Sequence, residues 1–289
     1  MELSGWDAAA VFAKAFTYAA TLGAAGAIFF LGYSGSLLLE PQRSRIRRLI
    51  VIALAAAAFA SCARILLSAA SMSGDLAGMF DGDFARMILR AGEGRATGIR
   101  IAGLALATLA ISSKPAFRAM AAVGAGVAAI SFAYVGHIAR SPDLVPALVL
   151  CIHLLCAAFW LGALAPLLIA TKDGTGAQVA ALASRFGNLA LGVVLLLLCA
   201  GAGLLWTLVA DATQFWSSDY GRMMVVKLFT VAALLATAAM NKLYLTPKLL
   251  SGHAPTVTQF RRNVRVEMII GALILLITAA FTTVTGPPG

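Results

Sequence analysis

Eight long runs of apolar residues constrain the fold of this chain more than any other feature. The runs cover residues 15–39, 49–72, 98–112, 117–138, 144–171, 186–210, 221–245 and 267–285. Most of them reach or approach the roughly 20 residues that an α-helix needs to cross the hydrocarbon core of a membrane. The sequence therefore predicts an all-α, polytopic membrane helical bundle with eight transmembrane helices.

The composition supports the same fold class. Hydrophobic residues make up 61% of the 289 residues and charged residues only 12%, whereas about a quarter of a soluble domain is charged. A soluble core of this size could not bury so much apolar surface, so the excess must face lipid. This excludes a secreted domain, a cytosolic enzyme and a disordered protein, and we expect residues 1–289 to form one transmembrane domain.

The basic residues predict the orientation of the bundle. Thirteen Lys and Arg fall in segments 40–48, 112–118, 172–185 and 242–266, and five fall in segments 73–97, 139–143 and 211–222. Because cytoplasmic loops carry the excess of basic residues, the first set is expected in the cytoplasm and both termini in the periplasm. We expect these residues to contact anionic lipids. Nucleic acid is not expected as a partner of the +10 chain, because no basic stretch belongs to a soluble module.

Weak similarities suggest that the chain consists of two halves, residues 1–138 and 139–289. Cys62 lies 14 residues after Arg48, and Cys199 lies 14 residues after Arg185. Since each half would hold four helices, an even number, the halves would form a parallel 4+4 repeat about an axis along the membrane normal. The sequence leaves open whether this repeat exists.

Some side chains within the apolar runs are ionisable, polar or able to bind soft metal ions. Because placing such a side chain in lipid is costly, each marks a candidate functional position. These residues are Arg64, His137, His153, Lys227, Asn241, Glu267, Cys62, Cys151, Cys156 and Cys199. Cysteines inside apolar runs do not indicate a disulfide framework, which is typical of small extracytoplasmic domains. As thiols they act either as small hydrophobic groups or as metal ligands.

His153 is the deepest of the candidate metal ligands. It lies ten residues into its run, about 15 Å from the outer end of a helix, and a ring N–H at that depth needs a partner. Helical periodicity places His153, Cys156 and Trp160 on one face and Cys151 on nearly the opposite face. Imidazole and thiolate together suit Cu(I). A hydrogen bond to a neighbouring helix is the alternative interpretation.

Three further residues are candidate ligands at a similar level of the membrane. Cys62 and Cys199 each lie 14 residues above a basic residue at the cytoplasmic side, about 21 Å along a helix. His137 closes the preceding run near the outer surface, and only a short connection joins this run to the one that holds His153. Because consecutive helices with a short connection are usually neighbours, we expect His137 close to His153. Contact of His137 with lipid headgroups alone is the alternative.

The remaining candidates are polar or charged positions along a transport path or with a structural role. Arg64 would either extend outward to the surface or attract an anion, and Lys227 would extend to the nearer surface. Asn241 and Glu267, with Lys242 beside them, are expected to form one polar cluster near the cytoplasmic face. Trp160 lies between His153 and this cluster.

Several segments of the second half resemble signatures of the copper resistance protein D (CopD) family. They are His153-Leu154-Leu155-Cys156-Ala157-Ala158-Phe159-Trp160-Leu161-Gly162-Ala163-Leu164, the preceding Gly136-His137, Tyr220-Gly221-Arg222 with Lys227, Asn241 and Pro247, and Arg265-Val266-Glu267. The resemblance implies a bacterial inner-membrane protein, not an enzyme, that imports copper and serves copper homeostasis and resistance. It also implies His137 and His153 as copper ligands and a periplasmic copper-binding protein of the CopC type as a partner.

A second resemblance leads to a different function. His153, followed by Trp160 seven residues later, is similar to a pattern in membrane haem-binding protoporphyrinogen oxidases. On this alternative, His137 and His153 would hold haem b, and the chain would be an oxidoreductase. The sequence also leaves open a scaffold or sensor role in which nothing is transported.

Overall fold

The protein folds into a bundle of long helices. The structure, a computed structural model, describes residues 5–112, 114–136, 143–172, 174–208, 218–252 and 255–284. Among these residues, eight helices are long and apolar enough to cross a membrane. They are α1 (Gly5–Ser34), α2 (Glu40–Ser73), α4 (Gly92–Ala107), α5 (Pro115–Ile130), α6 (Leu144–Lys172), α7 (Gly176–Leu208), α9 (Asp219–Met240) and α11 (Thr256–Val284). The prediction of an all-α, multi-pass membrane bundle is confirmed.

Short helical elements extend or connect the long helices. They are η1 (Gly35–Leu37), η2 (Leu76–Phe80), α3 (Gly82–Arg90), η3 (Thr108–Ile111), η4 (Ser131–Tyr134), the π-turn η6 (Asn241–Leu245) and α10 (Thr246–Leu250). Helix α3 starts at an N-cap, because the Asp81 side chain accepts hydrogen bonds from the backbone N–H groups of Asp83 and Phe84. Residues 84–89, which the sequence predicts as a short helix on the periplasmic face of the membrane, lie within α3.

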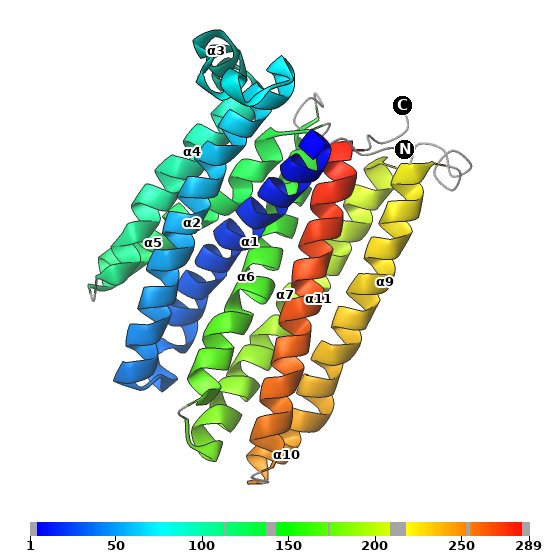
Figure 1. The fold of residues 1–289 in the computed structure, drawn as a ribbon. Helices are drawn as coiled ribbons and strands as arrows, with labels where there is room; N and C mark the ends of the chain where they lie inside the picture. The colour runs from blue at the N-terminus through cyan, green and yellow to red at the C-terminus, as the bar shows by residue number, and fades with distance from the viewer. Residues whose placement is uncertain are drawn as a thin grey trace.

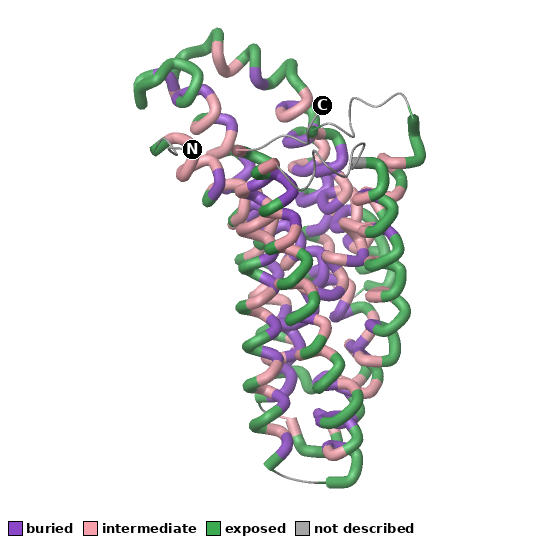
Figure 2. Tube along the Cα trace, turned by 90° about the vertical axis from the view of Figure 1, so that its right-hand side faces the viewer, coloured by how far each residue is buried: buried purple, intermediate pink, exposed green. Residues whose placement is uncertain are grey.

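The two described chain ends lie at the same end of the bundle, which we call the upper end (Figure 1). Helix α3 also lies at the upper end, and α10 lies at the opposite, lower end. Helix α1 is central, since it packs against α2 and α5 from its own half and against α6 and α11 from the other half. Figure 2 shows buried residues inside the bundle and exposed ones along its outside. The 4+4 repeat stays a prediction.

Seven of the eight long helices begin earlier than their apolar runs. Helix α2 starts at Glu40, where Gln42 Oε1 accepts a hydrogen bond from the Leu39 backbone N–H at 2.9 Å. Segment 40–48, expected as a loop, is therefore wholly helical. The physical reason is that hydropathy marks the part of a helix inside hydrocarbon, while the same helix continues through the polar headgroup layer.

The extended helix starts place additional charged residues within the bundle. Helix α1 begins ten residues before the run at 15–39, and α4 begins at Gly92, six residues before the run at 98–112. Lys14 and Glu93, which lie outside the apolar runs, are consequently helical. Arg100, at the edge of its run, lies about 12 Å into α4.

Helices α1 and α6, which belong to different halves, cross in close contact at Gly26 and Gly162. A Cβ atom on Gly26 would overlap the carbonyl oxygen of Ala158 and the Cα atom of Gly162, and a Cβ atom on Gly162 would overlap the carbonyl oxygen of Leu22. Only glycine therefore allows the two backbones to approach this closely. Within lipid, such van der Waals packing across small residues drives helix association.

We predict that Gly26→Ala destabilises the protein whereas Gly23→Ala does not. The added methyl group at Gly26 would overlap α6, while a Cβ atom on Gly23 meets no atom within 4 Å. Overpacking costs about 1–3 kcal/mol, so the Gly26→Ala melting temperature in detergent should fall by several degrees. Equal melting temperatures of the two variants would contradict the tight crossing.

Candidate functional site

His153 lies on the upper half of α6 and its ring faces α7. A Cβ atom on Gly201 would lie 3.4 Å from Cε1 and 3.6 Å from Nδ1 of this ring, so the absence of a side chain there makes room for the imidazole. The backbone of Leu197 on α7 also lies beside the ring. Its Nδ1 atom is buried and has no hydrogen-bond partner among the described residues. The imidazole thus offers a nitrogen for an additional ligand.

Cys156 and Trp160 continue below His153 on the same face of α6. The helix is continuous from Leu144 to Lys172, so the three side chains follow one another at helical spacing, over about 10 Å along the axis. Cys156 and Trp160 are both buried. Cys151 lies almost opposite His153 on the helix. One face of α6 therefore carries an imidazole, a thiol and an indole in sequence from the upper end downwards.

A cavity of about 210 Å³ lies below this stripe, between α6, α7, α9 and α11. Its lining includes Trp160, Phe186, Asn241, Lys242 and Glu267. The stripe on α6 therefore ends at a space with polar groups, in the lower half of the bundle. A buried polar group within a membrane bundle is costly and requires partners.

The pairing of Asn241 with Glu267, predicted from the sequence, is confirmed. The Asn241 amide Nδ2 donates a 2.5 Å hydrogen bond to Glu267 Oε1, and both side chains are buried. Asn241 opens the π-turn η6, and its carbonyl oxygen accepts a 2.7 Å hydrogen bond from Thr246 Oγ1. The Oδ1 atom of Asn241 has no hydrogen-bond partner among the described residues.

Lys242 has a different partner from the one expected. Its Nζ atom donates to Oδ1 of Asn188 on α7, and Gly187 leaves space for its alkyl chain, since a Cβ atom there would lie 3.0 Å from Lys242 Cδ. Sequence reasoning did not find Asn188. An asparagine within the apolar run at 186–210 was the available signal, because an amide at membrane depth needs hydrogen-bond partners.

Not every predicted ligand lies near His153. Cys62 and Cys199 are exposed on the surface of the bundle. Cys199 lies two residues from both Leu197 and Gly201, so it points away from the face of α7 that holds the imidazole. The sequence leaves open whether these two thiols meet His153, and in this structure both lie on the surface of the bundle. His137 lies outside the described residues, and within them no group of three or more His, Cys, Asp or Glu side chains could hold a metal ion.

Lys227 and Arg64 each interact with another side chain of the protein. Lys227 on α9 is half-buried, with Nζ 5.3 Å from the centre of the Phe281 ring, and its charge acts on His153. Arg64 on α2 forms a 2.8 Å ion pair with Glu93 on α4. The Arg64 side chain is only 13% exposed, so it does not extend to the surface as one alternative predicted.

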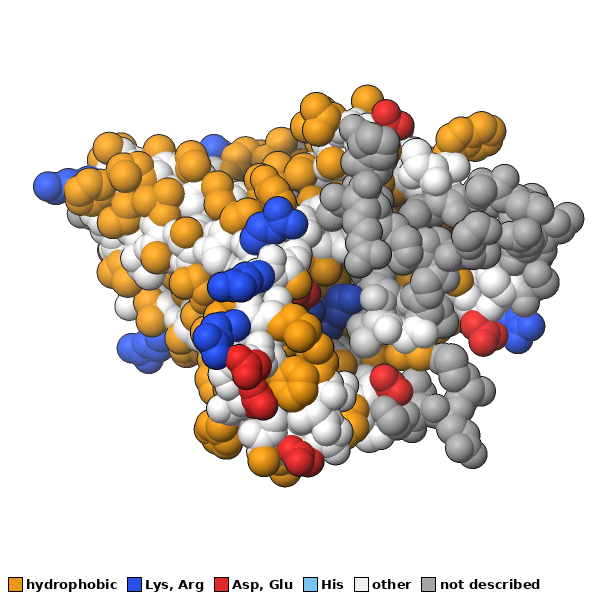
Figure 3. Space-filling model, turned by 90° about the horizontal axis from the view of Figure 1, so that it is seen from above, with side chains coloured by type: hydrophobic (Ala, Val, Ile, Leu, Met, Phe, Trp, Pro, Cys, Tyr) orange, Lys and Arg blue, Asp and Glu red, His pale blue; other side chains and the backbone are white. Residues whose placement is uncertain are grey.

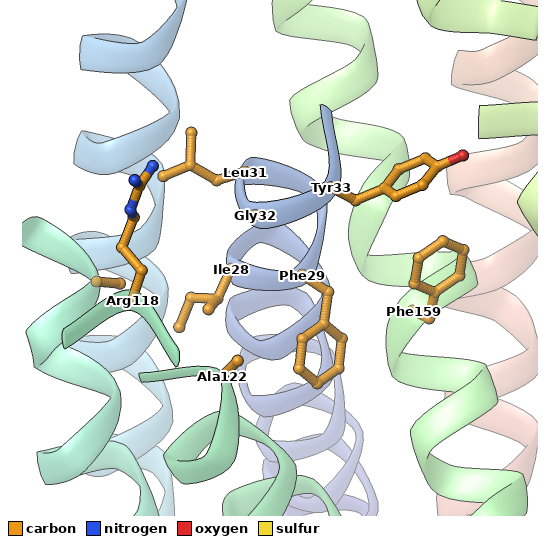
Figure 4. A pocket seen from close by; sticks show the side chains of 9 residues that line it. Ile28, Phe29, Leu31, Gly32, Tyr33, Arg118, Ala122 and Phe159 are labelled. Carbon is orange, nitrogen blue, oxygen red and sulfur yellow. The ribbon is translucent and has the colours of Figure 1, made fainter. Parts of the chain in front are cut away.

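A second cavity, of about 270 Å³, lies between α1, α5 and α6 in the lower half (Figure 4). Its lining residues are Ile28, Phe29, Leu31, Gly32, Tyr33, Ala110, Arg118, Ala122 and Phe159. None of these nine residues is a His, Cys or Met, the side chains that suit a soft metal ion. This apolar cavity is therefore no candidate for a copper site.

Two family models match the chain. Residues 5–147 match the model described as copper resistance protein D-like, N-terminal domain, and residues 180–281 match the model described as copper resistance protein D. The second match contains Lys227, Asn241 and Glu267, while His153 lies between the two matched segments. Neither model describes a haem protein, so the haem alternative gains no support. No curated protein and no solved structure matches the chain. Because both models describe the same family and together span most of the chain, this membrane protein belongs to the copper resistance protein D family.

Proposed function

We propose that this protein imports copper across the bacterial inner membrane through its second half, and so serves copper homeostasis and resistance. The observation that carries the proposal is the buried Nδ1 atom of His153. It has no hydrogen-bond partner among the described residues and stands at the top of a face of α6 that leads to the cavity beside Glu267. Membership in a copper resistance family supplies the identity of the cargo.

The side chains along α6 favour Cu(I) over harder metal ions. Imidazole and thiolate are ligands that bind Cu(I) well, and Cys156 follows His153 at a spacing that brings the side chains of one helix face together. We expect His153 to receive the ion and Cys156 to be its next ligand. Their small number suits transport, because an ion must bind well enough to enter and weakly enough to leave.

The lower cavity offers the next position on the path. A copper ion passing Trp160 would reach the carboxylate of Glu267 and the unpartnered Oδ1 atom of Asn241. Oxygen ligands hold a soft ion more weakly than sulfur does, so this cavity would favour release towards the lower end. The Lys227 ammonium near His153 weakens binding of a cation at the upper position by like-charge repulsion.

The orientation of the path follows from the distribution of basic residues. The segments richer in Lys and Arg lie at the lower end of the bundle, which the positive-inside rule assigns to the cytoplasm. His153 would then lie in the periplasmic half. We infer that a small periplasmic copper-binding protein of the CopC type delivers the ion at the upper end, and that the basic lower end contacts anionic lipids.

We predict that His153→Ala abolishes copper uptake without preventing membrane insertion. The variant lacks the imidazole that receives the ion, whereas Cys151→Ala changes a thiol on the opposite side of α6 and should transport as the parent does. Uptake of copper by cells with matched amounts of each protein measures both effects. Undiminished uptake by His153→Ala would show that the site is misplaced.

We predict that Glu267→Gln slows copper transport about tenfold, the effect of a barrier raised by about 1.4 kcal/mol, and leaves Cu(I) binding at His153 intact. The substitution preserves size and an oxygen that accepts from Asn241 but removes the negative charge that attracts the ion. Glu40→Gln is the matched control, because Glu40 is 73% exposed at the lower end. Equal transport rates of Glu267→Gln and the parent would remove Glu267 from the path.

The predicted orientation is tested by reporter fusion. A C-terminal alkaline phosphatase, which is active only in the periplasm, should be active, and a C-terminal green fluorescent protein should not fluoresce. Fusions after Lys172, at the lower end, should give the reverse pattern. A fluorescent C-terminal fusion would contradict both the orientation and the assignment of His153 to the periplasmic half.

A further inference from the structure

The first half of the bundle contains a partly buried group of charged side chains that the copper path does not use. It consists of Lys14 on α1, Arg64 on α2, and Glu93 and Arg100 on α4, and we call it the upper basic cluster. Figure 3 looks onto this end of the molecule, where basic and acidic side chains interrupt the hydrophobic surface. The group lies in the half opposite to His153, so it requires a separate physical explanation.

Arg100 is the most deeply buried member of the upper basic cluster, with 0% of the residue exposed. Its Nε atom donates to Ser131 Oγ at 3.1 Å and its Nη1 atom donates to Ser61 Oγ at 3.4 Å. The guanidinium also lies 4.1 Å from the centre of the Phe132 ring. These three partners are neutral, and Nη2 is buried with no hydrogen-bond partner among the described residues.

The charges of the cluster do not balance. Glu93 forms an ion pair with Arg64 at 2.8 Å, and the Lys14 ammonium donates to the backbone carbonyl of Thr282 at 2.9 Å. Arg64 and Glu93 act electrostatically on both Lys14 and Arg100. Three basic side chains therefore share one carboxylate, and no described carboxylate forms an ion pair with Arg100. An uncompensated guanidinium inside a membrane bundle is strongly unfavourable.

Thr97 supplies a second unused donor next to Arg100. It lies three residues before Arg100 on α4, so the two side chains leave the helix on neighbouring positions of one face. Its Oγ1 atom is buried and has no hydrogen-bond partner among the described residues. A hydroxyl and a guanidinium N–H group both donate hydrogen bonds to anions.

We propose that the upper basic cluster binds a small inorganic anion, of the size of chloride, with Arg100 Nη2 and Thr97 Oγ1 as its donors. The anion supplies the negative charge that the three basic side chains lack. Complete burial of Arg100 excludes a lipid headgroup as the occupant. Like-charge repulsion excludes a copper cation, so this site is distinct from the copper path and stabilises the first half of the bundle.

The test is the thermal stability of the purified protein in detergent, in sodium chloride and in sodium gluconate at equal ionic strength. A ligand that binds only the folded protein raises the melting temperature with its concentration. We expect chloride, bromide and nitrate to raise it relative to gluconate, which is too large for a buried site. The chloride effect should persist in His153→Ala, so that failure of the copper proposal leaves this result unchanged.

Variants locate the anion. Thr97→Val keeps the size of the side chain and removes the hydroxyl. It should reduce the rise in melting temperature caused by chloride at least several-fold. Thr108→Val in η3, directly after α4, changes an exposed threonine whose hydroxyl donates to the Ala105 carbonyl oxygen, and it should leave this rise unchanged. Arg100→Gln should abolish it. If Arg100→Gln does not fold, the comparison of Thr97→Val with Thr108→Val still decides.

A crystal soaked in bromide gives the direct position. We expect an anomalous peak within hydrogen-bond distance of the Arg100 guanidinium. Equal melting temperatures in chloride and gluconate would overturn the proposal. A bromide peak only at surface lysines or arginines, or stabilisation by anionic lipid in place of chloride, would do the same.

Discussion

The crossing of α1 and α6 is the contact on which the rest of the structure depends. Hydrophobic side chains gain little by leaving lipid for one another, so helices in a membrane are held together by close van der Waals packing. Gly26 and Gly162 allow such packing between the two halves. Because α6 carries His153, Cys156 and Trp160, this contact also fixes the candidate copper path against the central helix α1.

The two halves combine one scaffold with two kinds of buried polar chemistry. Along the second half, an imidazole, a thiol and a carboxylate follow one another towards the lower end, a set of ligands for a metal cation. In the first half, basic side chains outnumber carboxylates around Arg100, which repels a cation and requires an anion. Separation of the two groups by helices keeps their opposite charge preferences from interfering.

The fold was predictable from the sequence because lipid imposes a minimum length on apolar helices, and all eight runs correspond to helices. Their starts were not predictable in the same way, since hydropathy does not report how far a helix continues beyond the hydrocarbon. For this reason Lys14, Glu93 and Arg100 were missed. The pairing of Asn241 with Glu267 followed from their matching depth, whereas the outward direction of Cys62 and Cys199 depended on how each helix is rotated within the bundle, which spacing alone does not give.

X-ray absorption spectroscopy of the purified protein loaded with Cu(I) tests the central claim most directly, because it reports the atoms bound to the metal. The account predicts a spectrum with both nitrogen and sulfur ligands in the parent protein. It predicts loss of the imidazole contribution in His153→Ala and loss of the sulfur contribution in Cys156→Ser. A spectrum that is identical in the parent protein and in His153→Ala would contradict the assignment of the copper path to this face of α6.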